Sequence, residues 1–382
     1  MAGISLSDSA SNNLKKLNVS SNSTAKLSGV VDISKFISLQ EFTLNATGVT
    51  KFTGNKNLLS LELFENNFST FPTISSSPNL KTLKINNDNL LTGSVPDLSL
   101  NNALVTLDLS QNSLTGQLPK FNVLPALKLA DFRNNNFSGQ IPALTANTVL
   151  QQFYSNENNN LSGFIPSLDN NSDLFNFNIT KNGLSGSIHD FNNTPNLQTY
   201  HIFRNNLTGS LPTLSATPNL ITADFNENYL TGSIPFLNNL TKIQTLNINN
   251  NALSGSIPEI TNLVSLEAFR IQNNKRLGRT GIIGDIPDLS GSSNLKTFDA
   301  ASNQLTGWAG TVWPSSRENQ NIQIQNNNLT TAALNTLLSA LCATGATNGT
   351  IQMGGSNGSP TGGSSNPQRL ILVDRGWTAE VN

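Results

Sequence analysis

The sequence is short of the residues on which many protein functions depend. It contains one cysteine, Cys342, two histidines and 12% charged residues, with a net charge of −1. A single cysteine excludes an intrachain disulfide and argues against a structural zinc cluster. The small net charge provides no strong field to attract nucleic acid or an anionic membrane surface. Disulfide-stabilised, zinc-dependent and nucleic-acid-binding proteins are therefore all disfavoured.

Long apolar segments are also missing. No stretch of about 18 apolar residues occurs, so we expect no membrane-spanning segment. The first residues, Met-Ala-Gly-Ile-Ser-Leu-Ser-Asp, have neither the basic start nor the apolar run of a signal peptide. We expect a protein that stays where it is made, that leaves without a cleaved signal (for example inside a virus particle), or that has been shortened. The compartment stays open between cytoplasm, virion and cell surface.

Motifs of catalysis are absent as well. His189 replaces the proline of a repeated motif, and His201 is expected to point outward from a strand. No Gly-x-Ser-x-Gly occurs, and the glycines near Gly354 lack the lysine of a phosphate-binding loop. Cys342 is expected to be a small packed residue on a helix. We therefore predict that the protein is not an enzyme and that it has no catalytic residues and no cofactor.

One segment imitates the start of a calcium loop. Asp169, Asn171 and Asp173 have the spacing of calcium ligands, but the twelfth position is Thr180 instead of the required glutamate. We therefore predict no metal site.

The chain repeats itself about every 23 residues. The pattern Leu-x-x-Leu-x-Leu-x-x-Asn-x-Leu-Ser/Thr-Gly-x-Ile-Pro is clearest from Leu104 to Pro119, and most steps are 22 to 24 residues. The second anchor of each copy falls at Leu17, Phe42, Leu61, Leu83, Leu107, Ala130, Phe153, Phe177, Tyr200, Ala223, Leu246, Phe269, Phe298 and Ile322. Such a period predicts one elongated solenoid.

Each repeat predicts one turn of that solenoid. The Leu-x-Leu core has a period of two and indicates a short strand, which Ser/Thr-Gly ends before the extended Ile-Pro segment. The fold class is therefore an α/β solenoid, a curved right-handed coil of about 14–15 repeats. A parallel sheet is expected on the concave face and irregular returns on the other side. At about 4.8 Å per strand the arc is roughly 70 Å long.

An asparagine recurs where each strand ends. It occurs at Asn22, Asn66, Asn89, Asn112, Asn135, Asn159, Asn182, Asn205, Asn228, Asn251, Asn274, Asn303 and Asn327. A buried amide can satisfy backbone N–H and C=O groups with its two ends. We predict that these asparagines hold successive coils together.

The domain organisation follows from where the repeat holds. We predict an N-terminal cap at residues 1–13, a solenoid at 14–330 and a C-terminal cap at 331–382. Leucines at helical spacing predict a helix over Thr331–Leu341, followed by a Gly/Ser-rich loop at 354–366 and a strand over Leu370–Val373.

Two copies depart from the pattern. The second has Thr47 in place of the asparagine, and the twelfth carries extra residues, with Lys275 to Gly281 preceding Ile283. The prolines in segments such as Ser77-Pro78-Asn79-Leu80 favour single turns or 3₁₀ pieces in the returns.

The segments Asn228–Pro235 and Asn251–Pro258 carry a family resemblance. Their Asn-x-Leu-Ser/Thr-Gly-Ser-Ile-Pro pattern resembles the plant-type subclass of leucine-rich repeats. That subclass is found in receptor-kinase ectodomains and polygalacturonase-inhibiting proteins. The resemblance implies a second small sheet around the Gly-x-Ile-Pro segments and a protein that binds proteins, peptides, glycans or ice. The chain differs in lacking receptor-kinase parts and paired-cysteine caps.

Residues that face outward from the strands are the candidates for partner binding. Exposed aromatic and arginine side chains are the usual anchors of interfaces. We predict one contact patch on the middle coils of the sheet face, and the alternative is a set of scattered surface side chains. The predicted partner-binding residues are Tyr154, His201, Phe203, Arg204, Arg133, Phe175 and Asp224.

Three functions fit these features. The first is a non-catalytic binding or adhesion protein that recognises a protein or a glycan through the concave repeat face. The second is a structural component of a larger assembly, such as a virion decoration or fibre protein. The third is ice or polysaccharide binding through polar ladders such as Asn247, Asn249 and Asn250.

Overall fold

The computed structural model describes residues 13–20, 28–45, 48–87, 91–276, 278–314 and 318–382. These residues form two compact units, Met1–Leu184 and Ser185–Asn382. Each is described by itself. Asn22, Thr47, Asn89, Leu277 and most of the predicted N-terminal cap lie outside the described residues.

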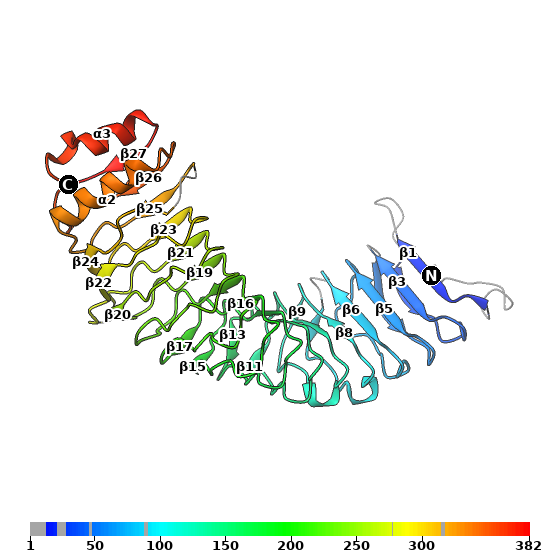
Figure 1. Cartoon of the computed structure of the whole chain (residues 1–382). Coiled ribbons are helices and arrows are strands. Elements are labelled where there is room, and N and C mark those ends of the chain that lie inside the picture. The colour runs from blue at the N-terminus through cyan, green and yellow to red at the C-terminus, as the bar shows by residue number, and fades with distance from the viewer. Residues whose placement is uncertain (1–12, 21–27, 46–47, 88–90, 277, 315–317) are drawn as a thin grey trace. The chain divides into compact units, whose positions relative to one another are not determined.

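Each unit is a solenoid built on one parallel main sheet, in which the strands lie side by side (Figure 1). The described strands of the first unit's main sheet are, in order, β1 (Lys16–Ser20), β3 (Glu41–Asn45), β5 (Ser60–Phe64), β6 (Thr82–Asn86), β8 (Thr106–Asp108), β10 (Leu129–Asp131), β12 (Gln152–Tyr154) and β14 (Asn176–Asn178). Those of the second unit are β16 (Thr199–His201), β18 (Thr222–Asp224), β19 (Thr245–Asn247), β21 (Ala268–Arg270), β23 (Thr297–Asp299), β25 (Asn321–Gln323), β26 (Thr350–Gln352) and β27 (Thr378–Glu380). The predicted solenoid with a parallel sheet is confirmed.

The period-two pattern places the core as expected. In β8, Leu107 is fully buried while Asp108 on its other side is half-buried, and Leu109 continues the core. The anchor side chains of neighbouring coils stack on one another, as in the Phe153 and Phe177 rings, whose centroids lie 5.5 Å apart. Each coil therefore buries its apolar face only against the coils beside it.

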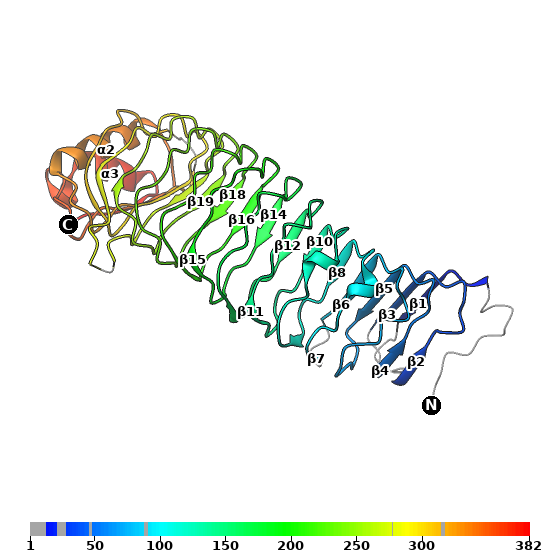
Figure 2. The same ribbon diagram turned by 90° about the horizontal axis from the view of Figure 1, so that it is seen from below.

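A second set of short strands lies along one edge of the coils, as the family resemblance implied (Figure 2). In the first unit β2 (Ser28–Asp32) pairs with β4 (Gly48–Thr53), β7 (Thr92–Gly93) with β9 (Ser113–Leu114), and β11 (Ser138–Gln140) with β13 (Asn160–Ser162). In the second unit β15 (Ser185–Ser187) pairs with β17 (Asn206–Thr208), and β20 (Gly255–Ser256), β22 (Ile282–Ile286) and β24 (Gln304–Trp308) form one sheet.

The asparagine ladder joins successive coils as predicted. Asn251 Nδ2 donates to the carbonyl oxygens of Phe225, one coil earlier (3.1 Å), and Ile248 (3.2 Å). Its Oδ1 accepts from the Leu230 N–H at 3.1 Å. Both ends of the buried amide are therefore used.

One ladder position was predicted wrongly. Asn158, not Asn159, is buried, and its Nδ2 donates to Phe132 O at 3.0 Å while its Oδ1 accepts from Phe137 N–H at 3.1 Å. Asn159 is exposed. Three successive asparagines occur at 158–160, so the pattern alone could not show which of them turns inward.

The returns are irregular and short, as predicted. They contain turns and the 3₁₀ helices η1 (Ser99–Asn101) and η2 (Phe121–Val123). A second row of buried polar residues, which the repeat pattern did not predict, supports these returns. Asn147 Nδ2, for example, donates to the carbonyl oxygens of Phe121 (3.1 Å) and Leu124 (2.8 Å).

The C-terminal segment differs from the prediction at one element. The helix α2 (Thr331–Ala343) is present as expected, and η3 (Gly363–Ser365) interrupts the Gly/Ser-rich loop. Leu370–Val373, however, lies in the helix α3 (Pro367–Asp374), not in a strand. Asn366 caps this helix by accepting from the Arg369 N–H at 3.0 Å, and Pro367 favours its first turn. The final strand is β27, eleven residues after Pro367 begins α3.

Candidate binding surface on the main sheet

The main-sheet strands place outward side chains of neighbouring coils next to one another. Because the pairing is parallel and in register, Asp131 of β10 lies opposite both Asp108 of β8 and Tyr154 of β12. Side chains at equivalent positions of paired strands are close enough to interact directly. The repeat thus arranges these outward residues as one continuous row in the first unit.

In the first unit, Arg133 joins two of these residues. Its guanidinium carbon lies 5.5 Å from the centroid of the Tyr154 ring, and its Nη2 lies 3.2 Å from Asp131 Oδ2. The Tyr154 hydroxyl donates to Gln152 Oε1 at 2.8 Å. The cation–π contact and the ion pair hold Arg133 and Tyr154 in fixed positions. We name Asp131, Arg133 and Tyr154 the first-unit cluster.

Burial changes the acidity of this cluster. The side chain of Asp131 is 6% exposed, although the alternation predicted an outward position. Burial, together with the charge of Asp108, raises the pKa of Asp131 to about 7, against the opposing effect of Arg133. Burial also raises the pKa of Tyr154, with a smaller contribution from the Asp131 charge. A desolvated carboxyl group is thus held beside an arginine and a tyrosine.

Phe175 lies in the same unit, at the entry to β14. Its side chain is half-buried, and its N–H donates to Gln151 O at 2.9 Å, so its backbone continues the main-sheet pairing. It leaves part of one aromatic ring accessible beside the strand.

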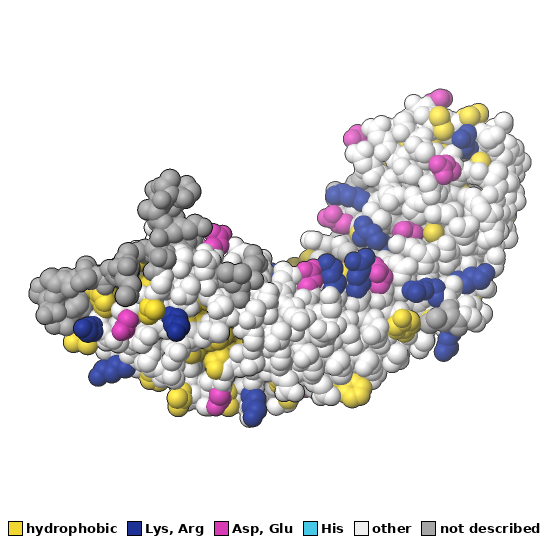
Figure 3. Space-filling view, turned by 180° about the vertical axis from the view of Figure 1, so that it is seen from behind, with side chains coloured by type: hydrophobic (Ala, Val, Ile, Leu, Met, Phe, Trp, Pro, Cys, Tyr) yellow, Lys and Arg dark blue, Asp and Glu magenta, His cyan; other side chains and the backbone are white. Residues whose placement is uncertain are grey.

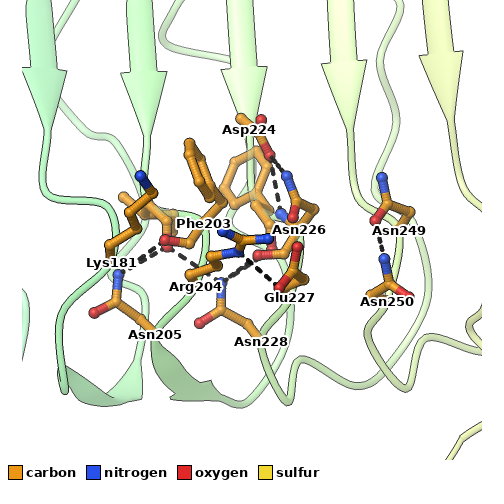
Figure 4. A network of polar contacts seen from close by, with 12 residues as sticks. Lys181, Phe203, Arg204, Asn205, Asp224, Asn226, Glu227, Asn228, Asn249 and Asn250 are labelled. Carbon is orange, nitrogen blue, oxygen red and sulfur yellow. Dashed lines mark hydrogen bonds and ion pairs between the residues drawn. The ribbon is translucent and has the colours of Figure 1, made fainter. Parts of the chain in front are cut away.

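The second unit contains the other predicted residues. His201 Nε2 lies 3.1 Å from Thr222 Oγ1, and burial lowers the histidine pKa against the opposing Asp224 charge. Phe203 is half-buried. Arg204 is exposed, and its Nε donates to Glu227 Oε2 at 2.8 Å, a contact that raises the arginine pKa (Figure 4).

Asp224 accepts hydrogen bonds at both of its carboxylate oxygens. Its Oδ1 accepts from the Asn226 N–H at 3.1 Å and also from the Asn226 side chain, and its Oδ2 accepts from Asn247 Nδ2 at 3.1 Å. Asn249 donates in turn to Asn247 Oδ1. Asn250 donates to Asn249 Oδ1 (Figure 4). These amides form a directed chain that ends at the Asp224 carboxylate, and such chains polarise their members.

The seven predicted residues therefore fall into two groups. Arg133, Tyr154 and Phe175 lie in the first unit, where Arg133 and Tyr154 are in contact. His201, Phe203, Arg204 and Asp224 lie in the second unit. A single patch formed by both groups stays a prediction. Asp131 was not among the predicted partner-binding residues. The alternation of the strand could not show that Arg133 pairs with it.

The described residues include few candidates for metal ligands. They contain no group of three or more His, Cys, Asp or Glu side chains that could hold a metal ion. Asn171, from the calcium-like segment, is buried and its Nδ2 donates to Asn147 O at 2.8 Å. Cys342 is half-buried on α2, its Sγ donates to Gln368 O at 3.0 Å, and burial raises its pKa. Within the described part of the chain, no helix is long and apolar enough to cross a membrane.

A hollow in the second unit was not anticipated from the sequence. It is lined by Asn205, Glu227, Asn228, Tyr229, Asn250 and Arg276. These residues follow the main-sheet strands and do not lie within them. A search for outward-facing residues of the strands therefore does not find them. The insertion after Asn274, which contains Arg276, is the one feature of the sequence that could have indicated this hollow.

Comparison with known proteins gives matches to the repeat and to the fold. The leucine-rich repeat family model matches residues 103–121 and 242–263. Among proteins of curated function, none matches this chain significantly in sequence.

Solved structures similar to the chain include plant receptors. The leucine-rich repeat ectodomain of the Arabidopsis receptor kinase HAESA, in complex with an N-terminally extended IDA peptide hormone, is 25% identical with a TM-score of 0.74, over 97% of this chain and 62% of that one. The plant peptide hormone receptor RGFR1, in complex with RGF2, is 23% identical with a TM-score of 0.75, over 100% of this chain and 64% of that one. The chain thus spans less than two thirds of these receptors.

A bacterial structure shares the fold too. The functional domain of InlJ from Listeria monocytogenes is 18% identical with a TM-score of 0.56, over 82% of this chain and 69% of that one. The described residues of our chain include no kinase, and one cysteine permits no paired-cysteine cap. The chain thus carries leucine-rich repeats, and its solenoid is similar to those of plant leucine-rich repeat receptors.

Proposed function

We propose that this protein is a non-catalytic binding protein that recognises a protein or a glycan through the exposed face of its main sheet. The observation that carries the proposal is the first-unit cluster, in which Arg133 lies over the Tyr154 ring and pairs with Asp131. Arginine and tyrosine are enriched among the residues that dominate binding energy. Their fixed positions reduce the conformational entropy lost when a partner binds.

The similar structures support the class of function. The HAESA and RGFR1 structures are complexes with peptide hormones. A solenoid of this kind can therefore take part in a complex with a peptide ligand. Which partner this chain takes depends on its own exposed residues.

The second unit would contribute a second group on its own sheet face. His201 and Phe203 are half-buried and Arg204 is exposed, so part of each side chain remains available. The Arg204–Glu227 pair is exposed and therefore contributes little to stability. Charged residues that stability does not require are suited to recognition.

The test is a pull-down from the native source with the full chain as bait. One variant combines Arg133→Ala with Tyr154→Ala, and a second combines His201→Ala with Arg204→Ala. We expect capture of a partner by the natural chain and reduced capture by the first variant, because removal of an aromatic anchor and its arginine typically costs about 2 kcal/mol or more of binding.

Matched controls remove exposed aromatics elsewhere. Phe164 and Phe236 lie outside the main-sheet strands and are 61% and 83% exposed. Phe164→Ala and Phe236→Ala should leave capture unchanged. A partner that both double variants retain would contradict the proposal.

The same controls address a second candidate function, a structural component of a larger assembly. Two largely exposed phenylalanines away from the main sheet are the observation that favours it, since large exposed apolar groups often mark contacts. Figure 3 shows one face of the molecule, on which charged and apolar side chains are scattered among other side chains and backbone. Loss of capture in the phenylalanine variants, with retention in the double variants, would support assembly.

A further inference from the structure

The hollow in the second unit is built from the flank of the coils and not from the sheet face. Its volume is about 350 Å³, which lies within the roughly 300–1,000 Å³ typical of small-molecule sites. Its lining residues follow the C-terminal ends of β16, β18 and β19, with Arg276 added from the insertion. The lining is mostly polar, and Tyr229 is the one aromatic residue in it.

The acidic and amide groups of the hollow are held in place. Glu227 pairs with Arg204 at 2.8 Å, so its charge is balanced before any ligand arrives. The Asn250 side chain donates to Asn249 Oδ1 and accepts from Asn273 Nδ2 at 3.1 Å. Asn228 is fixed by the ladder, where its Nδ2 donates to Phe225 O at 3.0 Å. A site with fixed polar groups loses little entropy on binding.

Arg276 is the cation of the hollow. Its Nη1 donates to Asn250 O at 2.8 Å, which draws the guanidinium back to the preceding coil. No carboxylate among the described residues forms an ion pair with Arg276 or with its exposed neighbours Lys275 and Arg279. This edge of the hollow therefore carries positive charge that the described part of the chain does not neutralise.

Tyr229 supplies a flat wall. Its side chain is 43% exposed and lies at the position directly after the ladder residue Asn228. The corresponding residue of the next coil, Ala252, is fully buried and does not line the hollow. An aromatic face with polar groups around it suits a ligand that has one apolar face and a polar rim.

We propose that this hollow binds a sugar ring that carries a carboxylate, as a unit of an acidic polysaccharide. Arg276 pairs with the ligand carboxylate, Glu227 accepts hydrogen bonds from ring hydroxyls, and the Tyr229 ring packs against the C–H face of the sugar. A peptide is less suited, because the lining provides no apolar recess for a side chain. The site goes beyond the proposed partner binding, since its residues lie outside the main-sheet strands.

The test is calorimetric titration of the full chain with a short oligogalacturonate and with its uncharged galacto-oligosaccharide counterpart. We expect saturable binding of the charged oligomer only. Arg276→Gln should weaken that binding about tenfold to hundredfold, the usual loss when a charge-assisted hydrogen bond is removed. Tyr229→Ala should also weaken it, because the flat wall is lost. Both side chains are exposed, and circular dichroism confirms that each variant is folded.

The matched control is Arg279→Gln. It removes the same charge three residues away, but Arg279 does not line the hollow. Binding within about twofold of the natural chain supports the site, whereas a loss equal to that of Arg276→Gln would show only general attraction of anions. The proposal is overturned by that result, by absence of binding, or by equal binding of an oligoglutamate peptide of the same charge.

Discussion

At the scale of single residues, one buried amide per coil connects the backbone of two neighbouring coils. Asn251 reaches the carbonyl oxygen of Phe225 and accepts from the Leu230 N–H, and equivalent residues do the same in other coils. An unsatisfied buried polar group costs about 1–3 kcal/mol, so each amide matters for stability out of proportion to its size. The 158–160 segment allows this to be measured, because it offers buried and exposed asparagines side by side.

We expect Asn158→Ala to lower the free energy of unfolding by about 1–3 kcal/mol, since Phe132 O and Phe137 N–H both lose a partner. Asn159→Ala, at an exposed position, should change it by less than about 0.5 kcal/mol. Urea denaturation followed by circular dichroism measures both. Equal effects of the two substitutions would show that Asn158 is not the ladder residue.

The Asp131 carboxyl group should make stability depend on pH. Its folded-state pKa of about 7 lies above the unfolded value of about 3.9, so the folded chain binds this proton more tightly. The contribution of this group to stability is therefore fully present below about pH 4. Between about pH 4 and pH 7 this contribution to the free energy of unfolding falls by at most about 1.4 kcal/mol per pH unit. Above about pH 7 it no longer changes with pH.

Asp131→Asn cannot ionise, so this pH-dependent loss should be absent from the variant. We expect the stability of the variant relative to the natural chain to increase between pH 5 and pH 8. Thermal midpoints at both pH values give the comparison. A difference that is the same at pH 5 and pH 8 would mean that Arg133 keeps the carboxyl group ionised throughout.

At the scale of elements, the strands were predictable and the C-terminal helix α3 was not. The Leu-x-Leu pattern has a period of two, which indicates a strand. The segment Leu370-Ile371-Leu372-Val373 is uniformly apolar, and such a run does not distinguish a strand from a helix. Its β-branched residues favoured a strand, but the capping by Asn366 and Pro367 at the first turn decided for a helix. Leu372 is fully buried, while Leu370 is 46% exposed.

This arrangement leads to a test of α3. In a strand, Leu370 and Leu372 would face the same side and contribute similarly to the free energy of unfolding. In the helix, Leu372→Ala should destabilise the chain by about 2–5 kcal/mol through lost packing, and Leu370→Ala by much less. Unfolding free energies of the two variants distinguish the cases. Similar losses at both positions would favour the strand.

At the scale of the whole molecule, the sequence predicted the architecture, whereas the repeat alone does not show which outward side chains are accessible. A period of about 23 residues determines a coil whatever its exposed residues are, so fold and core could be derived from spacing alone. Which outward side chains remain accessible depends on contacts between coils. Arg133 pairs with Asp131, and Asn226 and Asn247 donate hydrogen bonds to Asp224. The sequence of a single repeat predicts neither contact.

The insertion in the twelfth copy shows how such a chain can change its length. The step from Phe269 to Phe298 is 29 residues, six more than the usual step of about 23, yet β19, β21 and β23 keep their in-register pairing, from Asn247 to Arg270 to Asp299. Extra residues on the flank leave the sheet intact, and a complete additional coil would repeat contacts that already exist. During evolution, genes of this kind can therefore gain or lose whole repeats by unequal recombination, and acquire new recognition loops between them, without having to find a new fold.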